Sequence, residues 1–347
     1  METVPARLAN ARRAVKRAAR LLDAAPLKSR GPGITFTLEA RSNPNRSEIT
    51  MPDKALILGA SGHFGGQAAR AFATAGWHVE CYRRGTEMTG AATGAQVIVN
   101  GLNPPNYHAW DRLVPEITAS VLAAAKASGA TVCIPGNVYV FGTEPAPWDE
   151  DTPHRPVARK GRIRAEMEAR YQEAAATGLR TIVLRGGDFI DPDQAGGLFD
   201  RFVIGKAAKG VITTFGDPGA THAWAFLPDM ARAAAALAAN RNELAAFEDV
   251  PFPGLSFSTE ELARTVTELT GHAVRIRRFP WWIMNALSPF WELARELKEM
   301  RYLYDHPHAL GGDKFRRLLP EFPITPLQEV LKRFSGQLDL DPDQAVA

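Results

Sequence analysis

The sequence contains little cysteine and no long apolar run. Its two cysteines, Cys81 and Cys133, are too few for a disulfide framework or for a zinc site made of cysteines alone. Both stand in short apolar runs, HVECY and TVCIP, where we expect them to be buried in strands. Sparing use of cysteine is typical of the reducing cytoplasm, which is the location we expect. No run approaches the ~18 apolar residues that a transmembrane helix needs, so no membrane-spanning segment is expected.

The main body also lacks an excess of basic charge. Residues 1–50 carry ten Lys and Arg against four Asp and Glu, whereas the rest of the chain carries 31 basic and 34 acidic residues. Because a nucleic-acid-binding protein needs a basic face on its folded part, we expect no nucleic-acid partner. Residues 1–50 are interpreted as a basic, flexible leader. Three roles compete for it: a helix on an anionic surface, a targeting segment, or an appendage to a domain that starts at Met51.

Metal-ligand patterns are missing as well. The histidines are scattered, and the closest pair, His306 and His308, has only Asp305 nearby. We therefore expect no metal site. Ser-His-Asp hydrolysis lacks the sharp strand-to-helix turn that would expose its nucleophile. With 347 residues, 45% of them hydrophobic, the chain has enough apolar material for one large α/β unit or two lobes.

A glycine-rich turn follows the first strand-like run. Lys54–Gly59 is apolar, the glycines come next, QAARAFATA is helix-forming up to Gly76, and WHVECY is a second strand-like run. This order is the context in which a glycine turn binds a dinucleotide, because a pyrophosphate must approach the backbone and the helix N-terminus closely. A packing turn that has lost its cofactor is the alternative. The cofactor-binding residues predicted here are Gly59, Ser61, Gly62, His63, Phe64 and Gly65.

The end of the second strand indicates which nucleotide binds. An acidic residue there would accept a hydrogen bond from the ribose 2′-hydroxyl of NAD. Arg83 and Arg84 stand there instead, and guanidinium groups favour a 2′-phosphate. We therefore expect NADP rather than NAD, with merely solvated arginines as the alternative.

The GxxGxxG spacing resembles the extended short-chain dehydrogenase/reductase superfamily, the NAD-dependent epimerase/dehydratase family. The resemblance covers residues 54–335 and continues through AQVIVNGLNPP, TVCIPGNVYVFG, TIVLRGGDFIDP and THAWAFLPDMARAAAALA. It implies a doubly wound, mostly parallel α/β sheet of the Rossmann type with a smaller C-terminal substrate lobe. It also implies a homodimer and cofactor contacts at Asn100 and Phe189. The expected divisions are a nucleotide-binding domain (51–190), a substrate lobe with a late strand and helix returning to the Rossmann core (191–337) and a tail (338–347).

One expected element has little room. Only Gly85–Gln96 separates the second strand from the run that resembles the family's fourth strand. The helix there must be very short and the third strand missing or degenerate.

The family's catalytic Tyr-x-x-x-Lys pair is absent. None of the six tyrosines has Lys four residues later. Aligned on Glu168 of the helix ARKGRIRAEME, the tyrosine position holds Lys160 and the lysine position Arg164. The position of the assisting Ser or Thr holds Asn137.

Two hypotheses explain this altered set. Lys160 replaces the tyrosine as proton donor with a depressed pKa, while Arg164 holds the ribose or a substrate anion and Asn137 a carbonyl oxygen. Alternatively, the pair only binds cofactor. A third interpretation is that Lys160 and Arg164 belong to an exposed basic helix face without a functional role. By strand alternation Tyr139 shares a face with Asn137 and is an alternative acid, and Asp188 is a weaker substrate contact beyond a strand end.

The C-terminal third is the expected substrate lobe. Trp281, Trp282, Phe290 and Trp291 would pack in its core, line an apolar pocket or form an interface. The predicted function is an NADP(H)-dependent oxidoreductase or epimerase-like enzyme for a small carbonyl or hydroxyl compound. A catalytically inactive NADP-binding regulator or scaffold is the alternative.

Overall fold

Six short runs of the sequence, most of them apolar and buried, form the six strands of a parallel central sheet. The computed structural model describes residues 52–340, and expectations for the leader and for 341–347 fall outside this range. The strand order is β2-β1-β3-β4-β5-β9, and every pair is parallel. Strands buried on both faces are uniformly apolar, as parallel sheets require. Their bounds are β1 (Lys54–Leu58), β2 (His78–Cys81), β3 (Val97–Asn100), β4 (Thr131–Gly136), β5 (Thr181–Arg185) and β9 (Phe247–Pro251).

The sheet has no strand between β2 and β3 in sequence. Gly85–Gln96 holds only the four-residue helix α3 (Met88–Ala91), and β3 pairs directly with β1. The prediction of a very short helix and a missing third strand is confirmed. As a result β2 is the edge strand and Cys81 is exposed, so the prediction of two buried cysteines is wrong for Cys81 and right for Cys133.

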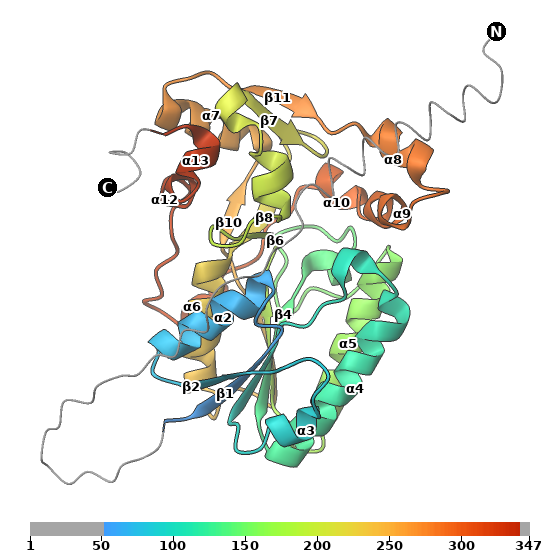
Figure 1. Cartoon of the computed structure of the whole chain (residues 1–347), viewed down its shortest axis with the longest axis vertical. Coiled ribbons are helices and arrows are strands. Elements are labelled where there is room, and N and C mark those ends of the chain that lie inside the picture. The colour runs from blue at the N-terminus through green and yellow to red at the C-terminus, as the bar shows by residue number, and fades with distance from the viewer. Residues whose placement is uncertain (1–51, 341–347) are drawn as a thin grey trace, which may run out of the picture. The chain divides into compact units, whose positions relative to one another are not determined.

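Helices cover both faces of the sheet (Figure 1). On one face, α2 (His63–Thr74) and α6 (Leu227–Ala239) pack with Ala55 and Ile57. On the other face, α4 (Trp110–Ser128) and α5 (Arg159–Ala175) pack with the alternate β1 residues, Leu56 and Leu58. This arrangement confirms the predicted doubly wound α/β fold.

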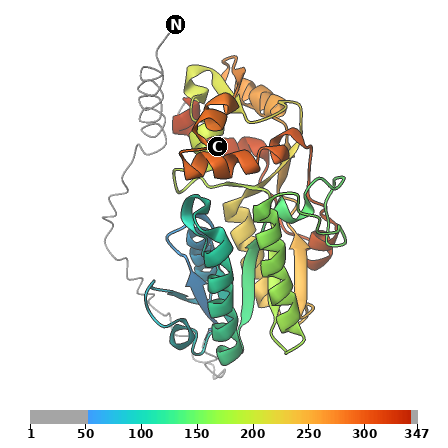
Figure 2. The same cartoon turned by 90° about the vertical axis from the view of Figure 1, so that its right-hand side faces the viewer.

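A second, smaller lobe lies at one end of the domain that contains the central sheet (Figure 2). This lobe contains a three-stranded and a two-stranded sheet. The first has the order β10 (Leu255–Phe257), β8 (His222–Phe226), β6 (Asp188–Ile190), and the second pairs β11 (Arg275–Arg278) with β7 (Val211–Thr214). Ser258 forms the capping box that starts α7, as the sequence pattern indicates. Short helices complete the lobe: η3 (Phe199–Val203), η4 (Ala207–Lys209), α7 (Thr259–Thr270), α8 (Trp281–Leu287), α9 (Glu292–Glu299), α10 (Tyr302–Asp305), α12 (Leu327–Lys332) and α13 (Ser335–Leu338).

The packed chain extends beyond Gln337, where we expected the tail to start. Leu338 and Leu340 are buried in the core of the smaller lobe.

Between residues 52 and 340, no helix has the length and apolar character needed to cross a membrane. The remaining short helices are η1 (Pro105–Tyr107), η2 (Val138–Phe141) and α11 (Asp313–Leu318).

Candidate functional site

The glycine turn brings three backbone segments together. Gly59 has φ +75°, which favours glycine, and a Cβ there would lie 2.8 Å from the carbonyl oxygen of Gly101. A Cβ on Gly65 would lie 2.2 Å from the carbonyl oxygen of Gly59. The turn after β1, the first turn of α2 and the turn after β3 therefore pack without room for side chains.

The N-terminus of α2 fits the phosphate part of a dinucleotide. Gly62 caps the helix without a side-chain hydrogen bond, and no acidic residue stands in the first turn. The first amides therefore remain available to an anion. Ser61 is exposed beside them, and the rings of Phe64 and Phe189 stack with centroids 6.4 Å apart. The predicted residues of the turn thus lie together around one helix end.

His63 joins the turn to the segment after β6. Its Nδ1 lies 2.8 Å from Asp191 Oδ2, and Gln67 Nε2 donates to Asp191 Oδ1 at 2.7 Å. Burial opposes the charge of Asp191, but these hydrogen bonds lower its pKa below the ordinary value. The imidazole is therefore held by a carboxylate and positions the turn.

The other predicted cofactor contacts near the Rossmann strands are Arg83, Arg84 and Asn100, and their surroundings differ. Arg83 and Arg84 are exposed at the end of β2 and have no ion pair among the described residues. Asn100 is buried: its Nδ2 lies 3.4 Å from the hydroxyl of Tyr171, and its Oδ1 accepts from the amide of Leu102. Asn100 therefore shapes the turn after β3 from inside the protein.

Lys160 is committed to an ion-pair network. Its side chain is fully buried, and Nζ lies 2.5 Å from Glu296 Oε2 and 2.7 Å from Glu299 Oε2. Both carboxylates belong to α9 in the smaller lobe. The plain reading of Lys160 as part of an exposed basic helix face is wrong. The geometry also argues against Lys160 as the proton donor, because its ammonium group is already engaged by two carboxylates.

Arg164 is the better placed of the two basic residues. Its guanidinium lies over the Trp110 ring at 4.8 Å, and Nη2 donates to Asn103 Oδ1 at 2.9 Å. Its Nε is buried and has no partner among the described residues. An unpaired buried donor of this kind is uncommon in folded proteins.

Asn137 and Tyr139 do not alternate on a strand. Strand β4 ends at Gly136, and Asn137 instead caps η2 by accepting a hydrogen bond from the amide of Tyr139. Our alternation argument is therefore wrong, and the Asn137 oxygen is already engaged. The hydroxyl of Tyr139 lies 3.4 Å from that of Tyr107. Burial raises the pKa values of both phenols, most for Tyr139, so both remain protonated at neutral pH.

Asp188 is a carboxyl group without a partner. It starts β6, directly after the carboxyl end of β5, and has no hydrogen bond or ion pair among the described residues. Burial raises its pKa to about 7. Its charge influences Tyr107, Tyr139 and Tyr304, whose pKa values burial has already raised. An acid that titrates near neutral pH thus faces three phenols.

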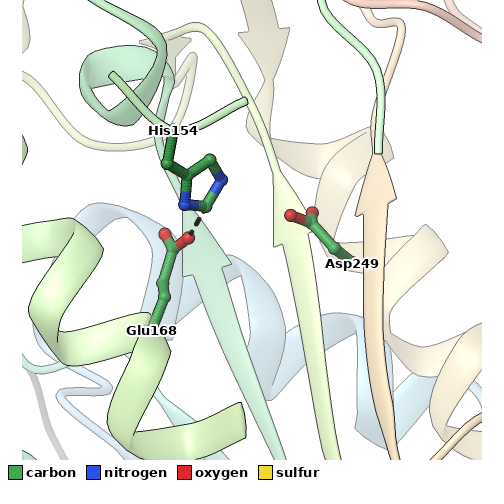
Figure 3. Close-up of side chains that lie close together, drawn as sticks. All are labelled: His154, Glu168 and Asp249. Atoms are coloured by element: carbon green, nitrogen blue, oxygen red, sulfur yellow. Dashed lines mark ion pairs between the residues drawn. The ribbon is translucent and has the colours of Figure 1, made fainter. Parts of the chain in front are cut away.

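Among residues 52–340, one group of side chains has the arrangement of metal ligands, but an arginine occupies the space between them. His154, Glu168 and Asp249 offer ligand atoms within 4.8 Å of one another (Figure 3). Arg185 Nη2, however, lies 2.8 Å from Glu168 and 2.5 Å from Asp249. A cation here would have to displace a guanidinium, so we assign the cluster to folding.

Several residues of the site were missed by sequence reasoning. Tyr107 and Tyr304 lie far apart in the chain and outside the quoted motifs. Asp191 stands three residues after Asp188, in a segment whose resemblance was noted. Glu296 and Glu299 are spaced i, i+3 on α9, and that spacing was the only signal that they share a face.

The comparisons with known proteins find structural relatives only. No protein-family model and no curated protein matches the sequence. Solved structures do match. One is the UDP-glucose 4-epimerase of Brucella ovis in complex with NAD, with TM-score 0.64 and 17% identity, covering 83% of this chain and 99% of that one. Another is a nucleoside-diphosphate-sugar epimerase from Pseudomonas aeruginosa, with TM-score 0.63 and 16% identity, covering 84% and 98%.

A third is DesIV, a dTDP-glucose 4,6-dehydratase from Streptomyces venezuelae with NAD bound. It has TM-score 0.63 and 17% identity, covering 82% of this chain and 97% of that one. At such low identity these matches establish architecture and leave the reaction open. The described chain therefore shares the α/β fold of these epimerase and dehydratase structures, which confirms the fold class that its motifs predicted.

Proposed function

We propose that the protein is an NADP(H)-dependent oxidoreductase or epimerase-like enzyme that acts on a small carbonyl or hydroxyl compound. The observation that carries this proposal is the unpartnered carboxyl group of Asp188 at the carboxyl end of the parallel strands. Ligands bind at that edge in open α/β sheets. The cradle at Gly59 and Gly65 supports a dinucleotide on the same fold, and proteins of this fold have been solved with NAD.

Each residue around Asp188 has a separate role in the proposed reduction of a carbonyl group. A reduced dinucleotide, held by its pyrophosphate at the glycine turn, would supply the hydride from its nicotinamide ring. Asp188, as the neutral acid, supplies the proton to the same carbonyl group, which becomes a hydroxyl. Tyr107 and Tyr139 remain protonated and donate hydrogen bonds to that oxygen. Arg164 takes the position of the family's lysine and holds the ribose. Reduction should then slow as the pH rises above about 7, because Asp188 loses its proton.

The nucleotide preference is tested first. Replacing Arg83 and Arg84 together by Ala should weaken NADPH binding about 10- to 100-fold, because the 2′-phosphate loses charge-assisted hydrogen bonds. NADH binding should not change. Fluorescence titration measures both, and Arg264→Ala, an exposed arginine on α7, is the matched control. Equal losses for both nucleotides would refute the 2′-phosphate assignment, and no binding of either by the wild type would refute the proposed function.

Lys160 is expected to stabilise the fold without supplying the proton. Lys160→Met removes the buried cation between Glu296 and Glu299, and only Arg159 then remains paired with Glu296. The melting temperature should therefore fall, whereas Lys160→Arg should retain most of it. The turnover of folded Lys160→Met should stay within a few-fold of wild type. Thermal melts and NADPH oxidation with a carbonyl substrate measure the two effects. A hundredfold loss of kcat at an unchanged melting temperature would restore Lys160 as proton donor.

A regulator that binds NADP without turnover is the second candidate. The buried ion pair of Lys160 favours it, since the family's tyrosine position is then structural. Saturable NADPH binding together with no turnover of any carbonyl compound would support it. The expected homodimer and cytoplasmic location remain predictions.

A further inference from the structure

Two large aromatic side chains of the smaller lobe project into solvent. Trp282, in the first turn of α8, is 72% exposed, and Phe290, in the loop between α8 and α9, is 85% exposed. Helix α8 buries three side chains at a spacing of three residues, and Trp282 stands on the opposite face of the helix. Of the aromatic residues that we expected in a core, a pocket or an interface, Trp281 is therefore core, whereas Trp282 and Phe290 are available to another surface.

The segment that carries these two aromatics has no charge of its own. Residues 279–291, with the sequence FPWWIMNALSPFW, contain no Asp, Glu, Lys or Arg. Exposed cations stand on both sides of this run: Arg277 and Arg278 at the end of β11, and Arg295 and Lys298, three residues apart, on α9. An apolar, uncharged surface is thus bordered by positive charge.

The acidic residues of α9 are paired with the domain that contains the central sheet. Glu292 Oε2 lies 3.1 Å from His108 Nδ1, and Glu296 and Glu299 pair with Lys160 on α5. By contrast, no described residue forms an ion pair or a side-chain hydrogen bond with the four bordering cations, Arg277, Arg278, Arg295 and Lys298. These cations therefore remain unneutralised by the protein itself.

Packing brings the two ends of this segment together. The guanidinium of Arg301, just after α9, lies 5.6 Å from the centroid of the Trp281 ring at the start of α8. Figure 1 shows α8 and α9 side by side at the edge of the smaller lobe, with β11 leading into α8. We call this edge the α8–α9 surface, and it comprises Arg277, Arg278, Trp282, Phe290, Arg295 and Lys298.

The composition of the α8–α9 surface fits an anionic lipid surface. Exposed Trp and Phe side chains insert at the boundary between headgroups and acyl chains, and flanking Lys and Arg residues attract anionic headgroups. A single-stranded nucleic acid fits less well, because it needs cations interleaved with stacking aromatics along its backbone. Here the aromatics stand in a run without any charge, and the cations stand outside it.

Two other occupants would meet charge of the same sign. A two-fold contact between copies of the chain places the same patch on both sides, so the four cations would oppose one another. The leader, residues 1–50, carries ten Lys and Arg against four Asp and Glu and would be repelled as well. An acidic surface is the occupant that neutralises the four cations.

We propose that the α8–α9 surface docks the protein on anionic membranes, with Trp282 and Phe290 inserted among the lipid headgroups and the four cations against their charges. The contact is peripheral. It involves neither the glycine turn nor turnover, so it holds or fails independently of the proposed function.

Vesicle binding by the full chain tests the proposal. The probes are vesicles of phosphatidylcholine alone and of phosphatidylcholine mixed with anionic phosphatidylglycerol, and co-sedimentation measures the bound fraction. We expect binding to the mixed vesicles that weakens between about 100 mM and about 500 mM NaCl, because salt screens the attraction. Binding to phosphatidylcholine alone should be weaker by about tenfold or more, because the anionic headgroups are absent.

Two variants remove the two components of the surface separately. Trp282→Ser with Phe290→Ser should weaken binding to the mixed vesicles by about tenfold or more, because the inserted apolar area is lost. Arg277→Ala with Arg278→Ala should weaken it by about 30-fold, since each basic residue near the surface contributes about fivefold. Because all four side chains are exposed, the melting temperature of both variants should stay near that of the wild type.

The chain offers a matched control for each variant. Val157→Ser changes an apolar residue that is 53% exposed and lies outside the α8–α9 surface. Lys126→Ala with Arg162→Ala removes two exposed cations from α4 and α5. Both controls should bind the mixed vesicles as the wild type does.

The proposal stands if both surface variants lose binding while both controls keep it, and every other pattern overturns it. No binding of the wild type to mixed vesicles refutes it directly. Binding that a surface variant leaves unchanged would assign the attraction to another part of the chain, such as the leader. Equal losses in the controls would make it a property of the whole protein. Binding of oligothymidine that both surface variants abolish, without vesicle binding, would identify a nucleic-acid surface instead.

Discussion

Asp188→Asn is expected to lower kcat for carbonyl reduction by about 10²- to 10⁴-fold, the usual contribution of a positioned acid. NADPH binding should change little, because Asp188 forms no hydrogen bond with the glycine turn. Steady-state NADPH oxidation and a fluorescence titration measure the two quantities. Asp151→Asn, an exposed loop carboxylate, is the matched control. Retained kcat in Asp188→Asn would remove Asp188 from the reaction.

The same variant has a second signature, which tests the raised pKa of Asp188 independently of turnover. The pKa of Asp188 is 3.8 in the unfolded chain and about 7 in the fold, so the native state binds more protons between these values. The wild type therefore loses stability as the pH rises through this window, whereas the asparagine variant does not. The difference in melting temperature between variant and wild type should grow from pH 4 to pH 7 and level off above. A constant difference would mean that the carboxyl group titrates normally.

Local pattern was enough to predict the sheet and the glycine turn. Both depend on residues close in sequence: an apolar run of five, glycines at fixed spacing and a helix-forming segment. The missing third strand was predicted for the same reason, since Gly85–Gln96 is too short for a helix and a strand. The structure confirms this by pairing β3 directly with β1.

Contacts between the lobes could not be predicted from the sequence, because the residues that form them are far apart in the chain. The resemblance aligned Lys160 with the family's tyrosine, and local reasoning therefore made it a candidate acid. Its partners Glu296 and Glu299 lie 136 and 139 residues further along the chain. Only the folded chain brings them within ion-pair distance, and they turn a candidate proton donor into a buried cation that joins α5 to α9.

Errors of local geometry have a different cause. The strand alternation assumed for Asn137 and Tyr139 fails because β4 ends at Gly136 and a tight turn follows. The register between β6 and β8, which places Asp188 beside Trp224, depends on strands 36 residues apart that no spacing rule connects. The candidate acid could therefore be named from the sequence, but its neighbour on the adjacent strand could not.

Arg185, Glu168 and Asp249 form an ion-pair cluster that connects several elements of the fold. Arg185 is fully buried on β5, between Glu168 on α5 and Asp249 on β9. It also donates to the backbone oxygen of Asn137 at 2.7 Å. One guanidinium thus joins a helix, two strands and the loop that leads to Tyr139.

Arg185→Met is expected to lower the free energy of unfolding by about 3–5 kcal/mol, because it leaves two buried carboxylates without a cation. Urea unfolding at pH 7 measures the loss. The loss should shrink toward pH 5, where the unpaired carboxylates take up protons in the variant's native state. Adding Glu168→Gln and Asp249→Asn should recover most of it, since neutral amides need no counter-ion. A small loss in Arg185→Met would contradict this role of the arginine, and stabilisation of the wild type by Zn²⁺ or Mn²⁺ would show that the cluster in Figure 3 binds metal.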